Sequence, residues 1–214
     1  MQKLYIYMYK EVYLHKSALI SQRFLQKMVS MLLKMEKLDP AKLWLMTDAE
    51  LIARVYMHKD ERLQFLYESY RDRNLPRTGM VIRLKDREFK ERIAGKQIKV
   101  IGEGKEFFEK FMKHTSAAEL EALEAVVGKI IKMPAHRVVI VPTLTPWRFV
   151  PKDILYHDEG RVLSLGATQK EYFEMLRSEM SDYMAVRVCV IGDRGLIYKN
   201  TAKILKAIKI FNSK

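Results

Sequence analysis

The sequence predicts an α+β protein, in which a helical N-terminal region is followed by a mixed α/β C-terminal region. Residues 3–75 contain almost no Gly or Pro, and their apolar residues recur three or four positions apart, as on one side of a helix. After Pro76, short runs rich in β-branched residues alternate with helical stretches. We therefore expect two domains, 1–78 and 79–214.

Three helices are predicted in the first region, and local signals mark their starts. Asp39 is a good N-cap and Pro40 a good first-turn residue, so the first helix should end before them and a new turn should begin there. Thr47 and Glu50 have the spacing of a capping box, and Asp60 precedes the third helix. The apolar stripe of the first helix consists of Ile20, Phe24, Met28 and Met31/Leu32.

The second region should contain several short strands and helices. The strands are predicted at residues 80–84, 97–101, 137–141, 154–156, 162–165 and 185–191. The helices are predicted at residues 86–94, 105–114, 117–132, 168–180 and 201–211. His157-Asp158-Glu159-Gly160 is typical of a hairpin turn, and we interpret Asp193-Arg194-Gly195 in the same way.

The composition is that of a basic globular protein. A net charge of +13 indicates either an anionic partner, such as a nucleotide or a nucleic acid, or a solvated lysine-rich surface. No continuous apolar run is long enough to span a membrane, and the N-terminus lacks the apolar core of a secretory signal. Cys189 stands alone in an apolar run, so we expect a buried strand residue in a cytoplasmic protein.

No catalytic constellation can be assembled from the sequence, which favours a chain without enzymatic activity of its own. His157-Asp158 is a His-Asp dipeptide, but it lies in a predicted turn, so we reject it as a metal site. Residues 102–105 match neither the Walker pattern nor the dinucleotide fingerprint. We therefore expect no catalytic residue, no metal and no cofactor.

Two basic clusters in the first region suit a ligand that combines a base with phosphates. Tyr13, His15 and Lys16 combine a phenol, an imidazole and an ammonium group on one helix. A second cluster consists of Arg71, Arg73 and Arg77, of which Arg73 and Arg77 would lie one helical turn apart if the third helix continued past Pro76.

The order of these segments resembles that of the HD-domain phosphohydrolases of the deoxynucleotide triphosphohydrolase type. The resemblance rests on residues 12–16, 46–48 and 70–77, and it covers residues 5–77. It implies that Tyr13 lines a nucleotide pocket and that His15 and Lys16 face the phosphates of an effector nucleotide. It also implies that the basic pair Arg73 and Arg77 contacts an activating nucleotide between subunits.

The sequence departs from that family because the metal-binding half, with its His, His-Asp and Asp ligands, is missing. The resemblance therefore predicts a non-catalytic C-terminal portion of an HD phosphohydrolase, used for oligomerisation and effector-nucleotide binding. Its partner would be a second copy or a separate HD catalytic chain, because residues 4–33 are apolar around much of their helix. The alternative is a basic nucleotide- or RNA-binding module without enzymatic activity.

Overall fold

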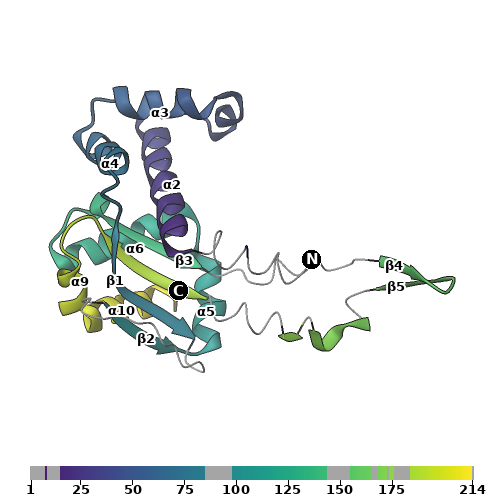
Figure 1. The fold of residues 1–214 in the computed structure, drawn as a ribbon. Helices are drawn as coiled ribbons and strands as arrows, with labels where there is room; N and C mark the ends of the chain where they lie inside the picture. Colours follow the sequence, from purple (N-terminus) through teal and green to yellow (C-terminus); the bar gives the residue numbers. More distant parts are fainter. Residues whose placement is uncertain are drawn as a thin grey trace.

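A four-stranded sheet with helices packed on both faces forms the centre of the protein (Figure 1). The computed structural model describes residues 15–84, 98–143, 155–164, 168–172, 174–175 and 184–213, together with Met8. The α-helices are α2 (Lys16–Glu36), α3 (Asp48–Met57), α4 (Glu61–Arg71), α5 (Lys105–Phe111), α6 (Ala117–Ile131), α9 (Gly195–Lys199) and α10 (Thr201–Phe211). The 3₁₀ helices are η2 (Pro40–Leu45), η3 (Met112–His114) and η4 (Ala135–Arg137). The predicted α+β class is confirmed.

The strand order of the main sheet is β2-β1-β6-β3. Its strands are β1 (Arg77–Leu84), β2 (Lys99–Glu103), β3 (Val138–Thr143) and β6 (Ala185–Val190). β1 runs parallel to β2 and antiparallel to β6, and β6 pairs antiparallel with β3. β4 (Leu155–Asp158) and β5 (Arg161–Ser164) form a separate two-stranded sheet. Strands from distant parts of the sequence therefore pair at the centre.

The two faces of the sheet bury two apolar clusters, because side chains alternate along each strand. Val139, Val141 and Cys189 face α2, α3 and α4, which lie together on one side of the sheet in Figure 1. The intervening residues Ile140 and Val188 belong to the other cluster, which α5, α6, α9 and α10 cover. The predicted burial of Cys189 is confirmed.

The helix starts of the first region agree with their predicted signals. Asp39 caps η2 by accepting a hydrogen bond from the Ala41 N–H, and Thr47 and Glu50 form both bonds of a capping box. The carboxylate of Asp60 accepts hydrogen bonds from the first turn of α4. These starts were predictable because each depends on contacts between residues two or three positions apart.

Two turn predictions had different outcomes. The hairpin after β4 is confirmed, and both of its central residues, Glu159 and Gly160, have the positive φ that a tight hairpin turn requires. The hairpin predicted at Asp193-Arg194-Gly195 is wrong, because α9 follows it instead of a strand. The Asp193 carboxylate there accepts a hydrogen bond from the Gly195 N–H, which is a helix-start interaction.

Two further predictions stay open. The predicted helix at residues 86–94 lies outside the described residues, as does most of the one at 168–180. The division at 78/79 stays a prediction; that position falls inside β1, and α2 shares one apolar cluster with β3 and β6.

In the part of the chain that the structure describes, no helix is long and apolar enough to cross a membrane.

Candidate functional site

A buried ion network joins α2 and α6 at the outer edge of β3. An edge strand leaves backbone N–H and C=O groups without a neighbouring strand, and buried groups of this kind need other partners. Arg23 and Lys27, both from α2, and Glu124 from α6 supply these partners. The network therefore takes the place of a fifth strand at this edge.

The distances show that the network is closely connected. The Glu124 carboxylate accepts hydrogen bonds from Arg23 Nη2 at 3.2 Å, from Lys27 Nζ at 2.7 Å and from the Ile140 N–H at 3.0 Å. Arg23 Nε donates to the Ile140 carbonyl at 3.3 Å. Lys27 Nζ also donates to the carbonyls of Ala135, at 2.8 Å, and Val138. All three protons of the ammonium group are used.

Burial makes this network electrostatically demanding. No more than 5% of any of its three side chains is exposed, and two cations share one carboxylate. Desolvation lowers the pKa of Lys27, while the attraction of Glu124 acts in the opposite direction. Since the ammonium protons and both carboxylate oxygens already have partners, we interpret the network as a clamp that positions α2, not as a ligand site.

The residues predicted to face effector phosphates lie at the N-terminus of α2. His15 is the N-cap, and its Nδ1 accepts a hydrogen bond of 3.4 Å from the Ser17 N–H. Lys16 is the first residue of the helix, and both side chains are exposed. Tyr13 lies outside the described residues. A helix N-terminus beside exposed basic groups is suited to binding phosphate.

The second predicted cluster lies where α4 gives way to β1. Arg73 and Arg77 were predicted to lie one helical turn apart if the helix continued, but α4 ends at Arg71. Arg73 has a φ of +56° and ends the helix in the left-handed region, whereas Arg77 is the first residue of β1. Both side chains are exposed.

Within one molecule, the structure keeps these two clusters apart. Arg77 pairs with Val190, which pairs on its other side with Val138, and Lys27 donates to the Val138 carbonyl. Arg77 therefore lies level with Lys27 along the sheet. Lys16 is eleven residues earlier on the same helix, about 16 Å away at 1.5 Å per residue. A ligand that contacted both Lys16 and Arg77 within one molecule would have to span this distance.

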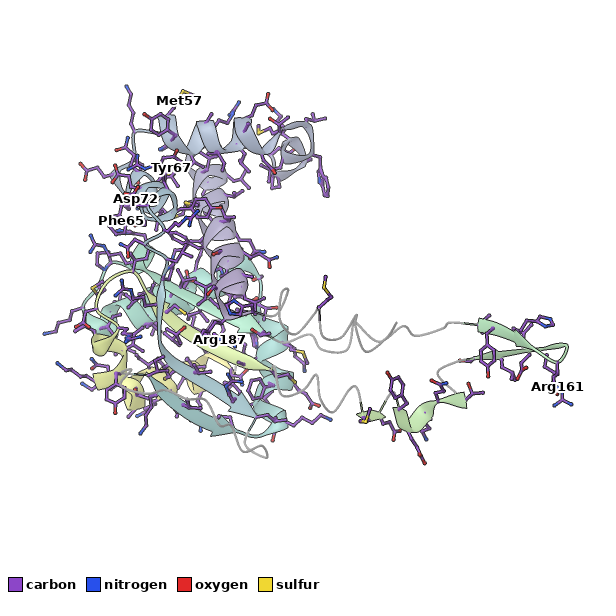
Figure 2. The ribbon with its side chains drawn as sticks, viewed as in Figure 1. Met57, Phe65, Tyr67, Asp72, Arg161 and Arg187 are labelled. Atoms are coloured by element: carbon purple, nitrogen blue, oxygen red, sulfur yellow. The ribbon has the colours of Figure 1, made fainter. Side chains whose placement is uncertain are left out.

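Two buried arginines, which the sequence analysis did not single out, lie on the α2-facing side of the sheet. By register, Arg83 is diagonal to Arg187 across the β1–β6 pair, and Figure 2 shows Arg187 on the sheet. Arg187 Nη1 donates to Thr143 Oγ1 at 2.8 Å. These residues occupy the end of the sheet nearest the N-terminus of α2. A charge inside an apolar run, as in residues 80–84 and 185–191, was the signal for them.

The candidate metal ligands and the one cysteine lie apart in the described residues. His157 and Asp158 are neighbours in β4, where successive side chains point to opposite faces. Nowhere in the described ranges do three His, Cys, Asp or Glu side chains gather as they would to hold a metal ion. Burial raises the pKa of the Cys189 thiol to about 11, so this thiol is not a nucleophile at neutral pH.

Fold and site together define a mixed α+β protein with basic groups at its helix ends and a buried clamp between two helices. Residues 5–106 match the family described as the HD associated region. This match relates the chain to HD-domain proteins and indicates an accessory part of such a protein. No curated protein and no solved structure matches the chain.

Proposed function

We propose that this chain is the non-catalytic C-terminal part of an HD phosphohydrolase of the deoxynucleotide triphosphohydrolase type, and that it serves oligomerisation and effector-nucleotide binding. The observation that carries the proposal is the match of residues 5–106 to the HD associated region. That segment contains all five of the predicted nucleotide contacts, which are Tyr13, His15, Lys16, Arg73 and Arg77. Hydrolysis itself would belong to the HD catalytic part that supplies the metal ligands.

The separation of the two basic clusters supports a nucleotide bound between subunits. Within one molecule, Arg77 lies level with Lys27 along the sheet, and Lys16 lies about 16 Å from Lys27 along the axis of α2. In an assembly, one subunit would contribute the α2 cluster and its partner would contribute Arg73 and Arg77.

A second candidate is a basic nucleotide- or RNA-binding module without enzymatic activity. The net charge of +13 favours it, as does the lysine face of α10. Ile204 and Ile208 are buried against the core, while Lys203 and Lys206 are exposed on the same helix. Such a surface would bind a polyanion with an affinity that falls steeply with salt.

A thermal-shift experiment separates the two candidates, because a ligand that binds only the folded state stabilises it. The wild-type chain is heated with dATP, dGTP, GTP or a single-stranded RNA oligonucleotide. We expect a nucleoside triphosphate to raise the melting temperature. The paired changes His15→Ala with Lys16→Ala, and Arg73→Ala with Arg77→Ala, should each abolish this shift.

Mixing the two paired variants tests the intersubunit site directly. Neither variant alone retains a complete site, but a mixed dimer contains one intact site, so part of the nucleotide shift should return. The control is Lys203→Ala with Lys206→Ala, which should leave nucleotide binding unchanged. If only RNA stabilises the chain, and this control variant loses the effect, the second candidate is correct. A chain that no nucleotide stabilises contradicts the first proposal.

A further inference from the structure

Two basic side chains share one aromatic ring where η4 meets α4. His136 and Arg137 belong to η4, directly before β3, and both contact Phe65, which is labelled on α4 in Figure 2. The guanidinium carbon of Arg137 lies over the Phe65 ring, 4.2 Å from its centroid. The His136 ring meets the same ring edge to face, with 5.6 Å between the centroids. We call these three partly buried residues the η4 site.

The cations of the η4 site have no acidic partner in the described part of the chain. Neither Arg137 nor His136 forms an ion pair there, and the buried Nε of Arg137 makes no hydrogen bond. The arginines of α2, α3 and α4 all differ in this respect, since each pairs with a carboxylate: Arg23, Arg54, Arg62 and Arg71. A guanidinium that is positioned by a ring and lacks a carboxylate is suited to binding an oxyanion.

The electrostatic surroundings also favour an anion. The charged groups that face His136 are Arg137 beside it, Lys27 from α2, and Arg62 and Asp60 at the start of α4. Asp60 is bound to Arg62, and Lys27 is held in the buried network, so the charge of Arg137 stays uncompensated. Burial and the three cations lower the pKa of His136 below 6.5. The potential at this position is therefore positive.

We propose that the η4 site binds a phosphate group, which accepts hydrogen bonds from the two terminal nitrogens of Arg137 and from the imidazole of His136. Stacking on Phe65 fixes the plane of the guanidinium, so its fork is oriented before the ligand arrives. Protonation of His136 adds a second positive charge and strengthens binding in acid. The site uses no residue of the two basic clusters, so it goes beyond the proposed function and does not rest on it.

Sulfate is the first probe, because it stays a dianion over the pH range in which imidazole titrates. Isothermal titration calorimetry of the full chain measures its dissociation constant at an ionic strength held constant with sodium chloride. Arg137→Gln should raise this constant at least tenfold. Arg54→Gln is the matched control, since it removes the same charge from an arginine that pairs with Glu36, and it should bind like the wild type. Equal weakening in both variants overturns the inference, because it would show only the general attraction of a chain with a net charge of +13.

A pH series tests the role of His136. At pH 8 the imidazole is neutral, so His136→Gln should bind sulfate as the wild type does. As the pH falls through 6.5, the wild type should gain affinity several-fold and the variant should not. Equal weakening by His136→Gln at every pH would contradict this role and indicate a structural one. In NMR titrations sulfate should raise the pKa of His136, because an anion favours its charged form, and an unchanged pKa would overturn the contact.

Competition against sulfate identifies the source of the phosphate group. Displacement by inorganic phosphate alone assigns the free ion, and displacement by glycerol 3-phosphate as well assigns a phosphate ester; displacement by neither overturns the inference. Circular dichroism confirms that each variant is folded. If Arg137→Gln is not, Arg137→Lys keeps the charge without the fork and should still bind sulfate several-fold more weakly than the wild type. The paired variants of the two basic clusters keep the η4 site and should bind sulfate normally, so failure here leaves the proposed function standing.

Discussion

Neutralising Glu124 should destabilise the protein more than any other single loss of charge among the ion pairs described here. Glu124→Gln keeps the shape of the side chain, so no cavity forms. It removes the negative charge that Arg23 and Lys27 share, and it turns one acceptor atom into a donor that faces other donors. Breaking a buried ion pair in this way costs about 3–5 kcal/mol. That is a large part of the roughly 5–15 kcal/mol by which domains are stable.

The measurement is urea denaturation followed by far-UV circular dichroism. Glu106→Gln is the control: Glu106 pairs with Lys110 on the surface of α5, where the two side chains are 78% and 54% exposed. Exposed pairs contribute about 0–1 kcal/mol, so this variant should remain close to wild type. If Glu124→Gln also loses less than about 1 kcal/mol of unfolding free energy, water screens the network and its desolvation is refuted.

A double-mutant cycle and a pH series extend this test. Lys27→Met removes one of the two cations. The double variant with Glu124→Gln should therefore lose less unfolding free energy than the two single variants lose in total. In Glu124→Gln alone, the pKa of Lys27 should fall further below its usual 10.5. The unfolded chain then binds more protons than the folded one, so the stability deficit should shrink as the pH rises towards 10.5.

Three further predictions concern single positions. Gly79→Ala should cost about 1–3 kcal/mol of unfolding free energy in urea denaturation, because the added Cβ would lie 2.6 Å from Ile197 Cβ. In the control Gly104→Ala, the added Cβ meets nothing within 4 Å, so this variant should stay within about 1 kcal/mol of wild type. Equal losses in the two variants would contradict the packing of β1 against α9. Cys189 should resist thiol reagents at pH 8 until urea unfolds the chain, since burial raises its pKa to about 11, and rapid reaction of the native protein would show that the strand is open. The hydrogen bonds from Arg62 lower the pKa of Asp60 from 3.8 to about 2. The stabilising effect of its carboxylate is therefore present above pH 3.8 and is lost as the pH falls towards 2. Asp60→Asn should flatten this part of the profile of stability against pH, and an unchanged profile would refute the role of Asp60.

Much of the local structure was predictable because it depends on neighbouring residues. The capping box of Thr47 and Glu50 and the cap at Asp60 require only two or three intervening positions, and both are formed. The hairpin after β4 likewise depends on the two turn residues Glu159 and Gly160. The hairpin expected at residues 193–195 was wrong because turn residues also begin helices, and only the next element distinguishes the two outcomes.

The candidate site was predictable only as a set of residue types. The sequence singled out His15, Lys16, Arg73 and Arg77, but spacing along the chain does not show that the first pair lies far from Arg77. That separation follows from the pairing of β1 with β6 and of β6 with β3. These pairings join residues more than forty positions apart, and more than a hundred apart for β1 and β6, so no local pattern specifies them.

By itself, the sequence determined the α+β class, the helical character of the first region and the helix caps. Each of these follows from short-range periodicity or local hydrogen bonding, whereas the relation to HD-domain proteins came from a resemblance in the order of motifs. The tertiary structure alone decided that Arg23, Lys27 and Glu124 meet at the edge of β3, and that Arg137 lies over the ring of Phe65. Burial and edge pairing are properties of the packed chain, since the same charged or apolar side chain is solvated in one arrangement and enclosed in another.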